Sequence, residues 1–436
     1  MVSNNWSFVN FGEVFAEPVR NGVYKAAEFQ GSGMQIVNMK ELFGYEFIGN
    51  QKMRKIELSN DEKERFLLKN GDLLFARRSI VEEGSGKISL IKGLTGELTF
   101  ESSIIRVRLN LEKAYPLFYY YYFSSPVGKP SITALSSGVT VKGIRGSDLR
   151  NVKIRYPPLT IQQKIAAILS AYDDLIENNL KRIKLLEEMA QITYEEWFVR
   201  MKFPGHETTP MDSETELPVG WSRGKLGNLA SYINRGISPD YVESDGSYVI
   251  NQKCIREHFV NFDEARFTSK ERKIPDEKLI KKFDILINST GTGTLGRVAQ
   301  VFESPSPSTV DTHVTIVRAS FTISALYLGR ALEHIDSFIA NLGKGATNQQ
   351  ELSRTDLAEI VKIVVPTKDL LIKYDEFSSP LYESISIYRS QNQLLKEARD
   401  ILLPRLMTGM IDVEQLDLPE PLGELSSNLT QEPQAA

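Results

Sequence analysis

Residues 157–198 of this 436-residue chain read PPLTIQQKIAAILSAYDDLIENNLKRIKLLEEMAQITYEEWF, and residues 366–407 read PTKDLLIKYDEFSSPLYESISIYRSQNQLLKEARDILLPRLM. A shift of 209 positions lays the first segment on the second and matches a proline followed by a long run of helical spacing. The residues just before them match too, because Val152-Lys153-Ile154 falls on Val361-Lys362-Ile363. A strand, a proline and a long helix thus occur twice, which predicts two copies of one module.

Both segments carry apolar residues at steps of three and four, the spacing of helices that pack along one face in a coiled coil. Thr160 with Gln163 predicts a capping box at the start of the first helix, and Gly409 predicts the end of the second. The predicted seam consists of Ile165, Leu169, Tyr172, Ile176, Asn179, Ile183 and Leu186 in the first helix and of Leu381, Ile385, Tyr388, Asn392, Leu395 and Leu402 in the second.

A helix of about 40 residues is about 60 Å long, which is too long to be buried within one globule. Its duplicate is the obvious partner. Because globules and helices alternate along the chain, an antiparallel pair would place one globule at each end and give a pseudo-two-fold internal repeat. Alignment of the helix midpoints predicts a contact between Asn179 and Asn392 that fixes the register. Two unrelated amphipathic helices, each packed on its own domain, remain the alternative.

Each half passes through the same order of β-branched runs, loops and short apolar helical pieces, which is typical of a mixed α/β (α+β) globule. The matching pieces are 71–75 with 283–287, 104–109 with 313–318, and 116–123 with 325–334. The predicted boundaries are 1–159 for the first globule, 160–203 for the first helix, 204–366 for the second globule, 367–411 for the second helix and 412–436 for an acidic tail.

The composition is that of a soluble globular protein, with 41% apolar and 25% charged residues. The single cysteine, Cys254, excludes an internal disulfide, and the four histidines show no metal-ligand spacing, so we expect a reducing cytoplasm and no metal. No signal peptide opens the chain, and its longest apolar run, 115–123, is too short to span a bilayer.

The formal net charge of -4 is unevenly placed. Six acidic residues and no lysine or arginine lie between Ile411 and Ala436, so the rest of the chain carries +2. This polar tail is predicted to be disordered. The remainder holds local basic clusters such as 51–55, 142–155 and 270–282, each of which an ordinary solvated surface would explain equally well.

Three segments resemble the DNA-specificity subunit of type I restriction-modification systems. Residues 152–165, VKIRYPPLTIQQKI, are similar to the entry into that family's first central region, and residues 173–179, DDLIENN, and 403–409, LPRLMTG, are similar to it as well. The second helix entry, 365–369, departs from the pattern because it lacks the Gln-Lys pair. The order of domains and helices resembles the family over nearly the whole chain, but individual residues match only in the helical regions.

The resemblance implies that each globule is a target-recognition domain that reads one half of a split DNA sequence, and that the helices set the spacer between the halves. It also implies that two modification subunits bind along the helices and methylate adenine, and that restriction and motor subunits join through them. S-adenosylmethionine, ATP and Mg²⁺ would then be bound by those partners, with no cofactor and no catalysis in this chain. The sequence agrees, since it has no Asn/Asp-Pro-Pro-Tyr run and no Gly-x-x-x-x-Gly-Lys-Ser/Thr phosphate loop.

Base reading requires bidentate side chains on exposed loops, with Arg or Lys for guanine and Asn or Gln for adenine, whereas Ser, Thr and glycine amides hold phosphates. Loops at matched places in the two halves supply such residues, and this recurrence distinguishes them from ordinary surface loops. The DNA-binding candidates are Arg77, Arg78, Ser79, Lys87, Thr140, Lys142 and Arg145 in the first half and Ser289, Thr290, Thr292, Thr294, Arg297, Lys344, Thr347, Asn348, Gln349 and Gln350 in the second.

Two other functions compete with this interpretation. Residues 291–296, GTGTLG, have the G-x-G-x-x-G spacing of a dinucleotide site with Asp311 twenty residues on, but residues 297–302 read as a strand where a helix is required. A coiled-coil adaptor with two protein-binding globules would share the duplication, the helices and the acidic tail. The tyrosine run 119–122 could serve as a base-stacking platform, although its apolar setting favours the core.

Overall fold

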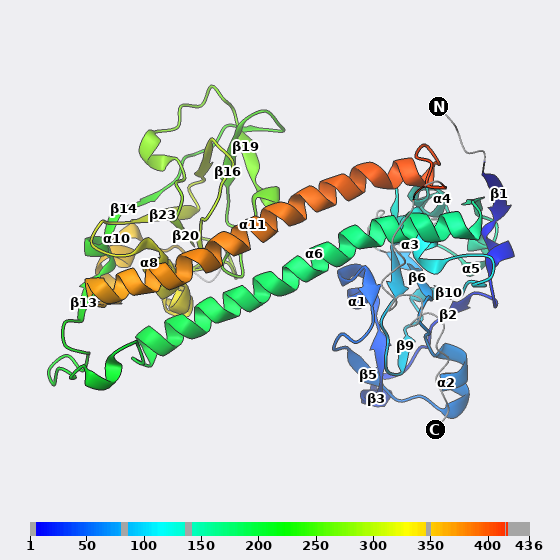
Figure 1. Cartoon of the computed structure of the whole chain (residues 1–436), viewed down its shortest axis with the longest axis horizontal. Helices are drawn as coiled ribbons and strands as arrows, with labels where there is room; N and C mark the ends of the chain where they lie inside the picture. Colours follow the sequence, from blue (N-terminus) through cyan, green and yellow to red (C-terminus); the bar gives the residue numbers. More distant parts are fainter. Residues whose placement is uncertain (1–5, 80–85, 136–141, 346–349, 415, 417–436) are drawn as a thin grey trace. The chain divides into compact units, whose positions relative to one another are not determined.

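The computed structural model describes residues 6–79, 86–135, 142–345, 350–414 and 416. The chain divides into two compact units: the first is Met1–Glu177 with Gln393–Ala436, and the second is Asn178–Asn392. Two long helices, α6 (Leu159–Tyr194, green in Figure 1) and α11 (Lys368–Met407, orange), each contribute a part to both units. The predicted acidic tail lies almost entirely outside the described residues.

The first unit has a sheet of order β2-β10-β6-β8-β4 and a three-stranded sheet of order β5-β3-β9, and side chains of both sheets share one hydrophobic core. The first strand, β1, pairs antiparallel with β12, the strand that leads into α6. The elements of this unit are β1 (Ser7–Asn10), β2 (Arg20–Asn21), β3 (Gln30–Val37), α1 (Met39–Gly44), β4 (Phe47–Ile48), β5 (Arg54–Ile56), α2 (Asn60–Phe66), β6 (Leu73–Ala76), β7 (Arg78–Ser79), β8 (Ile88–Ile91), β9 (Leu98–Phe100), β10 (Ile104–Val107), α3 (Pro116–Ser124), α4 (Lys129–Thr133), β11 (Lys142–Gly143), α5 (Gly146–Leu149) and β12 (Lys153–Tyr156).

The second unit has a sheet of order β14-β23-β20-β21 and a sheet of order β15-β19-β16-β22. Its first strand, β13, pairs antiparallel with β24, the strand that leads into α11. The elements are β13 (Ser222–Lys225), α7 (Leu226–Leu229), β14 (Ala230–Arg235), β15 (Tyr241–Val242), β16 (Ser247–Ile250), β17 (Ile255–Arg256), β18 (Phe259–Val260), β19 (Arg266–Thr268), β20 (Ile285–Asn288), β21 (Val298–Gln300), β22 (Ser308–Val310), β23 (Val314–Ala319), α8 (Ala325–His334), α9 (Asp336–Asn341), α10 (Arg354–Ile360) and β24 (Lys362–Val365).

A buried aspartate–arginine pair occurs at the same place in each unit. The Asp72 carboxylate accepts two hydrogen bonds from Arg108, and the Asp284 carboxylate accepts two from Arg318, all at 2.7 Å. Both aspartates are at most 1% exposed, and each also accepts the backbone N–H of the residue three positions earlier. Each aspartate therefore closes the turn before its strand, β6 or β20, and joins that strand to its neighbour, β10 or β23.

The tyrosine run lies in α3 and belongs to the core of the first unit. Tyr119, Tyr120, Tyr121 and Tyr122 are each at most 3% exposed. The Tyr121 hydroxyl donates to Asp173 of α6 at 2.5 Å. Because these rings are covered, the base-stacking alternative is wrong and the core interpretation is confirmed.

The two long helices run antiparallel within each unit. In the first unit the beginning of α6 and the end of α11 share a core that includes Ile165, Leu169 and Leu406, and Asp173 pairs with Arg399 at 2.5 Å. In the second unit the end of α6 meets the beginning of α11, where Ile183 and other side chains pack. Every predicted seam residue is buried or half-buried. The alternative of two separately packed helices is thereby excluded.

The predicted contact between the two seam asparagines is confirmed. Within the second unit, Asn179 Nδ2 donates to Asn392 Oδ1 at 3.0 Å and approaches Gln391 Oε1 at 3.4 Å. Asn179 is 7% exposed and Asn392 is 5% exposed. A hydrogen bond between two covered amides specifies one register, because any slip would bury both without partners.

The predicted capping box at Thr160 is wrong. The helix α6 begins at Leu159, so Thr160 lies inside its first turn. Gln162 binds the preceding segment instead, since its Nε2 donates to Pro157 O at 2.9 Å and its Oε1 accepts from Tyr115 N at 2.8 Å. The predicted end of the second helix is confirmed, because α11 stops at Met407 and Gly409 has a positive φ of 72°.

Asn179→Leu should destabilise the protein, whereas Asn179→Leu with Asn392→Leu should not. The single substitution leaves Asn392 buried without its partner, which costs about 1–3 kcal/mol, while two leucines replace the pair by apolar packing. Urea unfolding of the two single variants and the double variant measures the coupling. A double variant as unstable as the sum of its singles would show that the amide bond is not the reason for the asparagines.

Candidate nucleic-acid interface

In the first unit, the structure brings together two of the predicted DNA-binding loops. The short strands β7 and β11 pair antiparallel, with Lys142 opposite Ser79 and Gly143 opposite Arg78, and Ile144 N donates to Arg77 O at 2.9 Å. A Cβ on Gly143 would lie 3.0 Å from Arg77 O, so glycine allows this close approach.

The remaining candidates of this unit differ in exposure. Arg78 and Arg145 are exposed, whereas Arg77 is half-buried and its Nη1 donates to Ser102 O at 3.3 Å. Lys87 is half-buried, and its backbone carbonyl accepts from Ala76 N. Thr140 lies outside the described residues.

In the second unit, the loop between β20 and β21 meets the segment around Glu351. Bridges join Thr290 and Lys344 to Glu351, and Leu352 N donates to Ser289 O at 2.9 Å. Both predicted loops of this unit are therefore brought together, as they are in the first unit. Thr347, Asn348 and Gln349 lie outside the described residues, and Gln350 is exposed.

The predicted loop 289–297 contains both surface and internal residues. Thr292 is exposed, and Thr294 Oγ1 donates to Thr290 O. Arg297 braces the loop from within, because its Nη2 donates to Gly293 O at 3.0 Å and its Nη1 to Ile255 O at 3.3 Å. Ser289 is fully buried and bonded to the Thr315 hydroxyl at 2.6 Å, so the prediction of a ligand contact by its side chain is wrong.

The glycine run 291–296 is followed by a strand. After Gly296 the chain enters β21 at Val298, with no helix between them. A dinucleotide fingerprint needs a helix N-terminus at that point to receive the pyrophosphate. The alternative of nucleotide-cofactor binding therefore fails on the structure as well as on the sequence.

Sequence analysis missed several polar residues beside these loops. Arg235 pairs with Glu351, and its Nη2 donates to Leu352 O at 2.8 Å. Thr290 Oγ1 contacts both Gln252 and His313. Gln252 lies two residues after the end of the strand β16, so its place shortly after a strand was the one available signal.

The outer faces of the long helices carry exposed apolar side chains at matched positions. Leu185 is 64% exposed, and its counterpart 209 positions later, Leu394, is 65% exposed. Ile192 is 60% exposed, and its counterpart Ile401 is 55% exposed. Isolated exposed apolar residues are common, but their repetition at helical spacing in both helices makes these positions candidates for an interaction surface. Leu185 with Ile192, and Leu394 with Ile401, are called the α6 stripe and the α11 stripe below.

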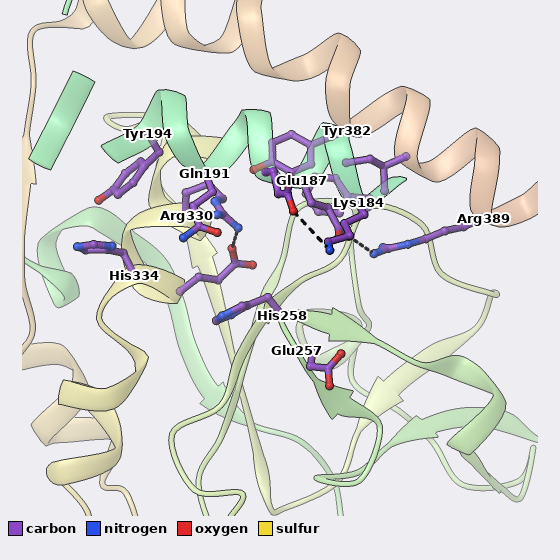
Figure 2. Close-up of a pocket in the computed structure, with 14 residues that line it drawn as sticks. Lys184, Glu187, Gln191, Tyr194, Glu257, His258, Arg330, His334, Tyr382 and Arg389 are labelled. Carbon is purple, nitrogen blue, oxygen red and sulfur yellow. Dashed lines mark hydrogen bonds and ion pairs between the residues drawn. The ribbon is translucent and has the colours of Figure 1, made fainter. Parts of the chain in front are cut away.

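A cavity of about 410 Å³ lies in the second unit between the long helices and the globule (Figure 2). Its charges compensate one another: Arg330 Nη1 lies 2.5 Å from Glu333, and Arg389 Nη2 lies 2.7 Å from Glu187. Burial raises the pKa of Glu333 despite Arg330, and burial lowers the pKa of Arg389 despite Glu187. The first pair lies within α8 and the second joins α11 to α6, so the internal pairing indicates a structural role for these charges.

Within the described part of the chain, no group of His, Cys, Asp and Glu side chains could hold a metal ion. The side chain of Cys254 is buried, and burial raises its pKa to about 11, so its thiol is protonated at neutral pH. No described helix is both long enough and apolar enough to cross a bilayer.

Comparison with known proteins gives a consistent result. Residues 4–188 match the model of the type I restriction modification DNA specificity domain. The chain is 27% identical over 408 residues to the type I restriction enzyme MjaIX specificity subunit of Methanocaldococcus jannaschii, with 90% of each chain covered. It is 30% identical over 189 residues to the EcoKI specificity subunit of Escherichia coli, covering 41% of this chain and 40% of that one.

A solved structure has the same fold. The crystal structure of the type I restriction-modification S subunit from M. genitalium superposes with a TM-score of 0.60 at 17% sequence identity. The superposition covers 93% of this chain and 97% of the other. The predicted fold, mixed α/β globules with a long antiparallel helix pair, is therefore confirmed.

Proposed function

We propose that the chain is a DNA specificity subunit of a type I restriction-modification system and that it recognises a DNA sequence in two separated halves, one with each globule. The match of residues 4–188 to the specificity-domain model and the MjaIX relative support the family, and the M. genitalium structure supports the fold. The chain is the recognition component, and catalysis resides in other subunits of the complex. One observation supports recognition of two half-sites: in each unit the two predicted loops meet. In the first unit β7 pairs with β11, and in the second unit a bridge joins Thr290 to Glu351. Two similarly built loop pairs can read two half-sites.

The chemistry of these loops suits duplex DNA. Exposed Arg78 and Arg145 in the first unit, and Gln350 in the second, supply donors for guanine, adenine or phosphate. Lys344 is exposed as well, but its Nζ already lies 2.8 Å from Asp356. With a net charge of only -4 for the whole chain, binding depends on local contacts, and we expect affinity to fall steeply with salt concentration. A coiled-coil adaptor that binds proteins would show no salt-dependent binding to DNA.

We assign the predicted ranges 1–159 and 204–366 to the two target-recognition domains. The ranges 160–203 and 367–411 then form the spacer between them. Two strands support this assignment. β12 leads into α6 and β24 leads into α11, and each pairs with the first strand of its globule.

The partners of the long helices are two modification subunits in this proposal. Similar exposure of the α6 stripe and the α11 stripe, at positions related by the internal shift, provides two similar docking surfaces for two copies of one protein. Restriction and motor subunits would join through the modification subunits. S-adenosylmethionine, ATP and Mg²⁺ would be bound by those partners, and the complex would work in the reducing cytoplasm, where the buried thiol of Cys254 suits it.

Long-read sequencing of N6-methyladenine in the source cell, with and without this gene, tests the proposal. We expect deletion to remove methylation at one motif of two defined half-sites around a fixed unread gap, and the gene supplied on a plasmid to restore it. If deletion removes no motif while the modification subunit is expressed, the DNA-recognition proposal fails and the protein-binding adaptor takes its place.

The spacer should follow the length of the helices. Insertion of seven residues into each helix adds about 10 Å, or about three base pairs, to the spacer while keeping the seam in phase. We expect methylation either to move to a motif with a longer gap or to be lost, as the methylome would show. Methylation that continues at the original gap would contradict a role for the helices in spacing.

A further inference from the structure

Three polar side chains from three separate segments of the second unit form one hydrogen-bonded chain. Thr290 Oγ1 donates to Gln252 Oε1 at 3.2 Å and lies 2.8 Å from His313 Nδ1. Gln252 follows β16, Thr290 follows β20 and His313 precedes β23. The chain lies beside the bridge from Thr290 to Glu351, among the loops proposed to meet DNA.

The hydrogen bond from Thr290 orients the glutamine amide. Thr290 has one hydroxyl proton and donates it to Gln252 Oε1, an arrangement that pairs with the His313 tautomer in which Nδ1 carries a hydrogen and donates it to Thr290 Oγ1. The amide is thereby held with its oxygen toward Thr290. Among the described residues, Gln252 Nε2 has no hydrogen-bond partner, so this donor is available to a ligand.

The backbone around Gln252 is held in place as well. Asn288, which is fully buried, donates from Nδ2 to Gln252 O at 3.0 Å. Gly291 has a φ of 108°, and a Cβ there would lie 3.1 Å from the Gln252 amide and 2.2 Å from Thr294 Oγ1. Glycine therefore allows the loop to close against the amide. A half-buried glutamine held from three sides loses little further freedom on binding a ligand.

We propose that Gln252 reads an adenine in the half-site of the second globule, an inference that rests on the proposed function of DNA recognition. The major-groove edge of adenine offers an acceptor at N7 and a donor at its N6 amino group. Gln252 Nε2 donates to N7, and Oε1 accepts from N6 with the lone pair that Thr290 leaves free. Guanine has acceptors at both N7 and O6, so O6 would face the glutamine oxygen and be disfavoured.

Thr290 and His313 act through Gln252 as positioning residues. If the Thr290 hydroxyl is removed, the amide can rotate and exchange its donor and acceptor ends. Both orientations would then be populated, and the preference for adenine would fall at the same base pair that Gln252 reads. A merely structural role for Thr290 would lower methylation at all sites equally.

Methylome sequencing of cells that carry wild-type or variant genes tests the assignment. We expect Gln252→Ala to relax one A·T position of one half-site, with discrimination reduced roughly 10- to 100-fold, while the other half-site stays unchanged as an internal control. Gln252→Glu has the same shape but only acceptors, and it should move the preference at that position toward cytosine, whose N4 amino group is a donor. Thr290→Val should relax the same position.

Gln393→Ala, at an exposed position of α11, is the matched control and should leave the motif unaltered. The inference is overturned if Gln252→Ala and Gln252→Glu both methylate the wild-type motif with its full selectivity. It is overturned equally if Gln252→Glu, whose shape is retained, loses methylation without any change of base preference in binding of the purified complex to duplexes varied at each position. Absence of any bipartite motif in wild-type cells would instead refute the proposed function.

Discussion

Glutamate at both Leu185 and Ile192 should remove one of the two modification subunits that we propose to bind the long helices. These two side chains of the α6 stripe are 64% and 60% exposed, so the substitution costs little in the free chain. In a protein interface each would contribute about 1.5–3 kcal/mol by burial of apolar surface, and each carboxylate would resist desolvation. We expect the affinity of that docking site to fall at least about 100-fold.

Glutamate at Leu394 and Ile401 should have the same effect at the other site. Native mass spectrometry of the complex should then show one modification subunit for either double variant and none when all four residues are replaced. Gln393→Glu, which adds a negative charge next to Leu394 but outside the α11 stripe, is the control and should retain both subunits. Retention of two subunits by the fourfold variant would exclude the stripes as docking surfaces.

Asp72→Ala and Asp284→Ala should each destabilise the protein by about 3–5 kcal/mol, because each leaves a covered arginine without its carboxylate. Arg108 and Arg318 have side chains only 18% and 19% exposed, and each donates two hydrogen bonds to its aspartate. Arg108 retains Glu17 at 2.6 Å, so the loss at Asp72 should lie toward the lower end of this range.

Urea unfolding measures the loss, and hydrogen exchange should place it in the unit that carries the substitution. The control is Glu359→Ala, which breaks the pair of Lys225 with Glu359 at 2.8 Å, where the side chains are 49% and 58% exposed. That change should cost less than about 1 kcal/mol. An aspartate variant no less stable than this control would mean that the buried pairs do not hold the strands.

Local pattern predicted the helices well but not their first turn. A seam of side chains at steps of three and four records burial on one face, so the pairing of Asn179 with Asn392 could be predicted from helix midpoints alone. At the start of α6, the Thr160 motif indicated a cap that the structure does not have. Gln162 instead binds Tyr115, which belongs to the globule, and that contact has no trace in the local sequence.

The candidate interface was predicted in outline from loops of suitable composition. The contact between the two loops of each unit depends on how the strands pair. The order of elements along the chain suggested this contact but could not specify the pairing. The burial of Ser289 was not predictable, since a serine at the end of a strand can face inward or outward. Gln252 was overlooked because the residues that orient it, Thr290 and His313, are distant from it in the chain.

By itself, the sequence determined the duplication, the two long helices, their register and the family resemblance, because each of these is written in the spacing of residues along the chain. Only the tertiary structure decided which polar groups meet, as in the pairs of Asp72 with Arg108 and of Gln252 with Thr290. The physical reason is that a hydrogen bond between distant residues depends on how strands pair and which face they bury. Periodicity in the sequence indicates that one face of a helix or strand is buried, but only the fold determines which residues contact that face.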